Sequence, residues 1–256
     1  MKKIFFGGIF ISNLFYISAQ SKAVTEIIYE TKLVSDSLNR NSFKIFNSTL
    51  LCNSTESVYF NREAKAFYEG TSKETISTSV GAIPKYPKSV ASVYRLNNTI
   101  TASLPLGKYV FTFEEPKLNW EILNETKKIK GFQCQLAKTV TDTGDTYFAW
   151  FTKEIPFQEG PFRFKGLSGL ILEVINKNKT IEIYAVEIKK SEEIIQPLHY
   201  GDDIKTKSKK QFLEARKNYQ ENPSMYNGNL KIVDSNGIDK TKKMADRIKS
   251  INTFLD

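Results

Sequence analysis

The residues that could perform acid–base or nucleophilic chemistry are few in this chain. His199 is the only histidine, and it follows the part of the sequence that is richest in strand patterns. A serine, histidine and aspartate triad would have to use it. The nearest approach to a nucleophile elbow is Gly166-Leu167-Ser168-Gly169, in which the second glycine comes one position too soon. We therefore predict a protein that is not an enzyme, with no catalytic residue and no cofactor.

Paired carboxylates are the remaining route to chemistry, since glycoside hydrolysis needs only two acids about 5 to 10 Å apart. The acids in the most distinctive part of the sequence are Glu121, Asp145, Glu154 and Glu173. Their spacing singles out no pair, so a carboxylate-dependent hydrolase is the least favoured function. The adjacent acids Glu192-Glu193 do not supply the alternating oxygens of a calcium loop, and no metal site is predicted.

The two cysteines, Cys52 and Cys134, have neither the spacing of a metal site nor that of a Cys-x-x-Cys redox pair. In an oxidising compartment an even number of cysteines favours a disulfide. Closing a loop of about 80 residues would contribute about 4 kcal/mol by the chain-entropy argument. Two buried free thiols in neighbouring strands are the alternative, and the sequence leaves both open.

The first twenty residues have the pattern of a cleaved signal peptide. Lys2 and Lys3 precede an apolar run at 4–17, and small residues follow at 18–20. The run is shorter than the roughly 20 residues that span a bilayer, and the first fifty residues contain no cysteine for lipid attachment. We therefore expect a soluble mature protein, periplasmic or extracellular, without a transmembrane anchor. Nucleic acid is excluded as a partner of such an exported chain.

Residues 21–200 must position any site, and their pattern is that of antiparallel strands. In 25–33 apolar and charged residues alternate with period two. Similar runs occur at 43–53, 93–96, 99–104, 108–113, 132–140, 147–152, 170–175 and 180–188. No long helical pattern separates neighbouring runs, so a parallel α/β sheet is unfavoured. The predicted fold is mainly β: a single antiparallel, strongly twisted sheet, shaped as an open half-barrel or bowl.

Residues 201–256 form the second predicted region, a helix and a basic tail. The run at 207–220 has apolar residues at helical spacing and is expected to pack on the sheet, whereas 240–251 is only weakly helical. The net charge of +9 is concentrated in this region. A solvated helix face explains the charge, and binding to acidic lipid or polysaccharide is the alternative. Residues 71–88 are expected to run over the surface.

Between Trp120 and Leu172 the sequence contains a series of motifs that are more specific than strand propensity alone requires. They are Gly131-Phe132-Gln133-Cys134-Gln135, Ala149-Trp150-Phe151-Thr152, Ile155-Pro156, Gly160-Pro161 and Gly166-Leu167-Ser168-Gly169-Leu170-Ile171. In this order they resemble the GLPGLI family, exported proteins of Gram-negative bacteria named for a six-residue motif. Ser168 stands where the naming motif has proline, which leaves the turn less rigid. The resemblance implies an exported β-rich domain without an established activity, and no catalytic residue.

The same motifs favour a turn that fixes strand register, because glycines can adopt positive φ or allow close backbone approach. The functional alternative is a concave aromatic surface with space beside it for a ligand. Its residues would be Trp150, Phe151, Phe162, Phe164, Gly166 and Gly169. We therefore predict a binding or carrier module for an apolar or carbohydrate ligand, such as a lipid or a glycan. A protein that docks on an envelope or outer-membrane partner is the alternative.

Overall fold

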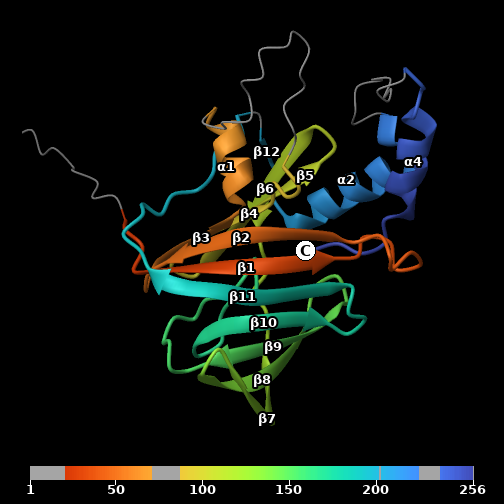
Figure 1. Ribbon diagram of the computed structural model, residues 1–256. Helices are drawn as coiled ribbons and strands as arrows, with labels where there is room; N and C mark the ends of the chain where they lie inside the picture. The colour runs from red at the N-terminus through yellow and green to blue at the C-terminus, as the bar shows by residue number, and fades with distance from the viewer. Residues whose placement is uncertain (1–20, 71–86, 202, 225–236, 256) are drawn as a thin grey trace, which may run out of the picture.

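The computed structural model describes residues 21–70, 87–201, 203–224 and 237–255 (Figure 1). The predicted signal peptide at 1–20 and most of the surface excursion predicted at 71–88 lie outside these segments. None of the helices in the four segments has the length and apolar character that a membrane-spanning helix needs.

Twelve strands of the described residues hydrogen-bond into one sheet, in the order β12-β6-β5-β4-β3-β2-β1-β11-β10-β9-β8-β7. The strands are β1 (Thr25–Leu33), β2 (Lys44–Cys52), β3 (Glu56–Phe60), β4 (Ser92–Leu96), β5 (Thr99–Leu106), β6 (Tyr109–Glu114), β7 (Glu121–Ile129), β8 (Phe132–Val140), β9 (Thr146–Thr152), β10 (Leu170–Asn176), β11 (Ile181–Lys190) and β12 (Ile204–Lys205). Because β12 and β7 are the two edges of this order, the sheet is open.

Two runs of consecutive antiparallel strands build the sheet. Strands β1 to β6, the first meander, follow one another in one direction, and strands β11 back to β7, the second meander, follow in the other. The meanders meet where β1 pairs with β11, from Thr25 opposite Lys190 to Leu33 opposite Ile181. The first of the described strands therefore lies in the middle of the sheet.

This architecture confirms the predicted fold class, a mainly β chain with one open sheet and a C-terminal helix. One pair departs from the antiparallel pattern, since Ile204 of β12 lies parallel to Phe111 of β6. Strands β3 and β7 were missed for opposite reasons. Every residue of β3 is buried, so period-two alternation is absent, whereas β7 is an edge strand without a buried residue.

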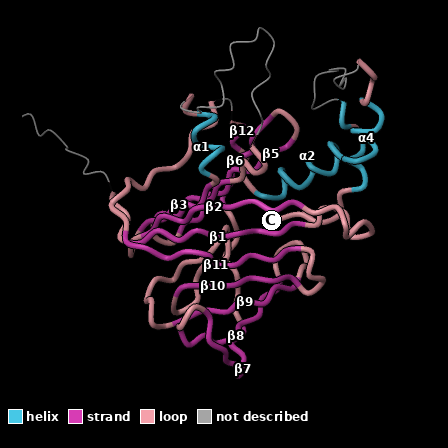
Figure 2. The backbone as a smooth tube through the Cα atoms, in the orientation of Figure 1, coloured by secondary structure: helices cyan, strands magenta, loops and turns pink. Residues whose placement is uncertain are grey.

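The sheet changes direction strongly along its order. Figure 2 shows β1 and β11 running across the view, whereas β5 and β6 rise steeply behind them. The main hydrophobic core draws on both meanders and on the connection between β9 and β10. A second, smaller core contains Leu51, Val58, Phe60 and Ile195.

Helices lie beyond the first meander in Figure 1. Helix α1 (Arg62–Tyr68) begins at Asn61, whose side chain accepts a hydrogen bond from the backbone N–H of Ala64. Helix α2 (Lys209–Glu221) matches the helix predicted at 207–220, and its Phe212 packs on two rings of β6. The helical region therefore shares the core of the sheet.

The part of the basic tail that the structure describes is attached to the rest of the molecule. Helix α4 (Thr241–Ser250) matches the weakly helical pattern, and residues 251–255 follow it. The backbone N–H of Asn252 donates to the carbonyl of Ser35 at 2.9 Å. The Gln220 side chain donates to the Ile251 carbonyl at 2.6 Å. This C-terminal segment therefore joins α2 to the end of β1.

Candidate functional site

The connection between β9 and β10, residues 153–169, is here called the motif loop, and its middle is unusually buried. All residues from 159 to 165 are buried, although connections usually run over the surface. A side chain at Gly169 would overlap the backbone carbonyl of Thr152, and Gly166 has a φ of +94°. Gly169 thus allows close approach of the backbone and Gly166 adopts a positive φ, the two roles that the turn interpretation of the motif gives to glycine.

The aromatic residues of the motif fill the core and do not form the predicted concave surface. Phe151, Phe162 and Phe164 are at most 1% exposed. The ring centroid of Phe164 lies 4.7 Å from that of Tyr147. Only Trp150 of the four predicted rings is partly exposed, on the opposite face of β9 from Phe151. Closely spaced aromatic residues stabilise a buried loop as readily as they form a binding surface, and three of these four rings do the former.

Charged side chains alternate with these rings, and they too are buried. Lys165 and Arg95 both contact the carboxylate of Glu159, one at each oxygen. The Ser57 hydroxyl donates to the same carboxylate at 3.0 Å. We call Arg95, Glu159 and Lys165 the cleft cluster. These contacts fasten the motif loop to β3 and β4 of the first meander. With two cations and one anion, the cleft cluster has a net positive formal charge.

A cleft of about 660 Å³ lies over this cluster. Arg95 and Lys165 form its largely buried base. Its exposed polar lining consists of Ser54, Thr55, Asn97, Asn98, Lys117 and Gln158. Phe157 and Leu118 add partly exposed apolar surface. Such a wall can hydrogen-bond to a hydroxylated ligand while a ring of the ligand packs on Phe157.

The amides of the cleft are available to a ligand. Asn97 and Asn98 form the hairpin turn between β4 and β5, as an Asn-Asn pair between two strand-like runs favours, and Asn97 has a φ of +52°. Gln158 faces them from the motif loop. Within the described segments, none of these three side-chain amides has a hydrogen-bond partner. The sequence marked the asparagines as a turn, but it gave no signal that the turn and the motif loop share a cleft.

A second charged group, the helix cluster, consists of the buried Glu115, Arg163 and Lys209 together with Asp142, which reaches the surface. Arg163 contacts Asp142 at 2.6 Å and Glu115 at 3.1 Å, and Lys209 of α2 contacts Glu115 at 3.0 Å. Burial raises the pKa of Glu115 against the opposing effect of Lys209 and Arg163. Burial also acts to raise the pKa of Asp142, but the bonds and charge of Arg163 outweigh it, and that pKa is lowered.

The acids and the histidine that the sequence offered for catalysis are not brought together. Glu121 pairs with Lys138, Glu173 pairs with Lys127, and Glu154 accepts a hydrogen bond from the backbone N–H of Gln133. Asp145 lies in the exposed turn between β8 and β9, and His199 is exposed after β11. In the described segments no group of His, Cys, Asp and Glu is arranged to hold a metal ion.

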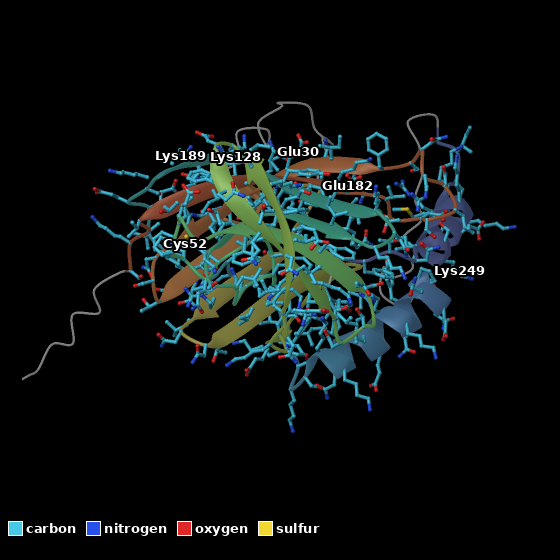
Figure 3. The ribbon with its side chains drawn as sticks, turned by 90° about the horizontal axis from the view of Figure 1, so that it is seen from below. Glu30, Cys52, Lys128, Glu182, Lys189 and Lys249 are labelled. Atoms are coloured by element: carbon cyan, nitrogen blue, oxygen red, sulfur yellow. The ribbon has the colours of Figure 1, made fainter. Side chains whose placement is uncertain are left out.

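Cys52 and Cys134, for which the sequence left a disulfide and free thiols both open, are free, buried thiols in the structure. Cys52 (Figure 3) ends β2, and Cys134 belongs to β8. Four strands lie between β2 and β8 in the sheet, which the sequence spacing did not reveal. Burial, followed by the charge of Glu159, raises the pKa of Cys52 to about 12. Burial also raises the pKa of Cys134. The two thiols are thus buried in strands that are not neighbours in the sheet.

Comparisons relate the chain to known proteins. Residues 54–212 match the family model described as N-glycanase peptide, N-terminal domain. Two structures of PNGF-II, from two crystal forms, are 18% identical, with TM-scores of 0.47 and 0.49. They cover 77% and 76% of this chain, which spans about a third (34%) of theirs. An uncharacterized conserved protein from Thermus thermophilus is 6% identical, with a TM-score of 0.35, and covers 72% of this chain and 90% of its own. No curated protein matches the chain.

Proposed function

We propose, from the premise that this chain belongs to the family of N-glycanase peptide N-terminal domains, that it is a non-catalytic module that binds a glycan in the polar cleft. The observation that carries the proposal is the set of amides of Asn97, Asn98 and Gln158, which lack partners in the described segments, beside the ring of Phe157. Sugar hydroxyls need both donors and acceptors, which a side-chain amide supplies.

The ligand class follows from the name of the family. An N-glycanase acts on N-linked glycans, so an oligosaccharide of that type is the first ligand to test. The cleft volume of about 660 Å³ is within the range of small-ligand sites, roughly 300–1,000 Å³. It suits one or two sugar rings at the end of a longer glycan.

The non-catalytic part of the proposal rests on the state of Glu159. Its carboxylate is engaged by Arg95, Lys165 and Ser57 beneath the cleft. Among the described residues, the cleft lining itself contains no acid that could protonate a leaving group or activate water. Hydrolysis of the bound glycan is therefore not part of the proposed role.

The test is binding of the purified protein to an array of N-linked oligosaccharides, followed by titration calorimetry with the best ligand. We expect Asn98→Ala and Phe157→Ala each to weaken binding by about tenfold, the value of one hydrogen bond or ring contact of about 1.4 kcal/mol. Asn124→Ala, on the exposed edge strand β7, is the matched control and should bind as the wild type does. Equal loss in all three variants, or no glycan binding at all, would overturn the proposal.

Export remains part of the proposed role, with the periplasm or the cell exterior as the site of action. The pattern of residues 1–20 and the resemblance to the GLPGLI family support it. Mass spectrometry of the protein recovered from cells should show cleavage after Ala19 or Gln20. An uncleaved amino terminus would contradict export by a cleaved signal.

A further inference from the structure

A second cavity, here called the apolar cavity, differs in chemistry from the cleft. It measures about 360 Å³ and lies between the first meander, helices α2 and α4 and the C-terminal segment. Apolar side chains from all of these elements line it, among them Leu33, Phe46, Leu104, Phe212, Ile248 and Phe254. Figure 1 shows the C-terminus returning between these helices and β1. Its volume is within the range of small-ligand sites.

The charged lining of the apolar cavity has one sign. Lys44, Lys88 and Arg216 line it, and no acidic residue of the described segments does so. Lys44 forms no ion pair within those segments, and burial, followed by the charge of Arg247, lowers its pKa. The Lys44 side chain is nevertheless exposed at the cavity wall, so it can reach a ligand. A bound anion relieves the repulsion between neighbouring cations.

The other two cations differ in how they are held. The Lys88 ammonium makes a long contact of 3.4 Å with the carbonyl of Ile45. The Arg216 guanidinium lies 3.9 Å from the ring centroid of Phe254, where it supports the apolar wall. Lys44 and Lys88 are therefore the cations best able to turn toward a ligand.

We propose that the apolar cavity binds a long-chain carboxylate, a free fatty acid. Its hydrocarbon chain lies among the apolar side chains between the sheet and α2. Its carboxylate is held by Lys44 and Lys88. Burial of the hydrocarbon chain away from water stabilises the complex, and the lysines select an anionic head over a neutral one. This site is separate from the proposed glycan site.

The proposal is tested with purified, delipidated protein and cis-parinaric acid, a fatty acid whose fluorescence rises on binding. We expect the probe to bind and palmitate to displace it, whereas hexadecanol, of the same chain length, should need about tenfold higher concentration. Equal displacement by the two would overturn the assignment of an anionic head group. Failure of the probe to bind would overturn the site itself.

Single-residue variants test whether the probe binds in the apolar cavity. We expect Lys44→Gln and Lys88→Gln each to weaken binding by about tenfold, and Leu104→Trp, which fills the cavity, to abolish it. Lys128→Gln, at an exposed lysine of β7 (Figure 3), should leave binding unchanged. If Leu104→Trp fails to fold, as judged by circular dichroism, the lysine variants and their control still show whether the probe binds in the apolar cavity. Binding that Lys128→Gln weakens as much as Lys44→Gln does would contradict the proposal.

Phospholipid vesicles distinguish the cavity from a lipid-binding surface. Palmitate should displace the probe, whereas vesicles of phosphatidylglycerol and phosphatidylcholine should not, because their acyl chains are anchored in a bilayer. Displacement by the vesicles, retained in Leu104→Trp, would locate lipid binding on the basic surface and overturn the cavity as the site.

Discussion

The cleft cluster and the helix cluster contain the same kinds of side chain, but they differ in how completely those side chains are paired. In the cleft cluster, both oxygens of Glu159 have cationic partners. In the helix cluster, one oxygen of Glu115 and the Nε atom of Arg163 have no hydrogen-bond partner within the described segments. A fully satisfied buried network rigidifies a structure, whereas a partly satisfied one lowers its stability.

The two clusters each contain a residue from the same short segment of the chain. Arg163 and Lys165 are two residues apart in the motif loop, and each belongs to a different cluster. The satisfied cluster supports the base of the proposed glycan site. The other fastens helix α2, which lines the apolar cavity. The comparison implies a rigid cleft and a more weakly attached helix.

The largest effect is expected from Glu159→Gln, because this change leaves Arg95 and Lys165 buried without a carboxylate. Removing one partner of a buried ion pair costs about 3–5 kcal/mol. We expect the free energy of unfolding, measured in urea, to fall by that amount. Glu125→Gln, at an exposed position of β7, should change it by no more than about 0.5 kcal/mol. A loss no greater than in that control would show that the cleft cluster does not stabilise the fold.

A smaller effect is expected from Glu115→Gln, because Asp142 still contacts both cations and one Glu115 oxygen already lacks a partner. We expect a loss of about 1–3 kcal/mol in the free energy of unfolding. Hydrogen exchange should become faster in α2 and stay slow in β1. A loss larger than that of Glu159→Gln would reverse the ranking of the two clusters.

The smallest effect is a dependence of the Glu115 contribution on pH. Because burial raises the pKa of this carboxyl in the folded protein, its contribution is fully present below the ordinary pKa of 4.5 and is lost as pH rises through the raised value. Urea unfolding of the wild type and of Glu115→Gln should therefore show a stability difference that shrinks from acid toward neutral pH. A difference that grows over that range would mean that pairing with Lys209 and Arg163 dominates over burial.

Much of the fold could be predicted from the sequence where strands have one buried and one exposed face. Strand β1 was located to the residue, since apolar and charged residues alternate along it. Helix α1 was missed because its seven residues present too short a pattern. The pairing of β1 with β11 could not be predicted, because alternation fixes which face is buried and carries no information on which strand lies alongside.

The candidate site was predicted less well. Three of the four rings of the distinctive motif are in the core, and the contribution of this segment to the cleft comes from Pro156, Phe157, Gln158, Lys165 and Gly166. The burial of Arg163 and Lys165 contradicts the usual exposure of charged residues. Their alternation with Phe162 and Phe164 was the one available signal. It could indicate a buried strand-like segment, but not the distant partners that make burial of the charges tolerable.

The pairing of β1 with β11, which joins the two meanders, limits the order in which the sheet can assemble. Each meander consists of neighbouring strands joined along the chain, so its pairs can form locally. Strand β1 is synthesised first, yet one of its edges stays unpaired until β11 has emerged after β7 to β10. Pairing over such a long sequence separation is slow, and an unpaired edge can pair with another chain. The strand that joins the two meanders in the finished sheet is therefore open to pairing with another chain until β11 has been made.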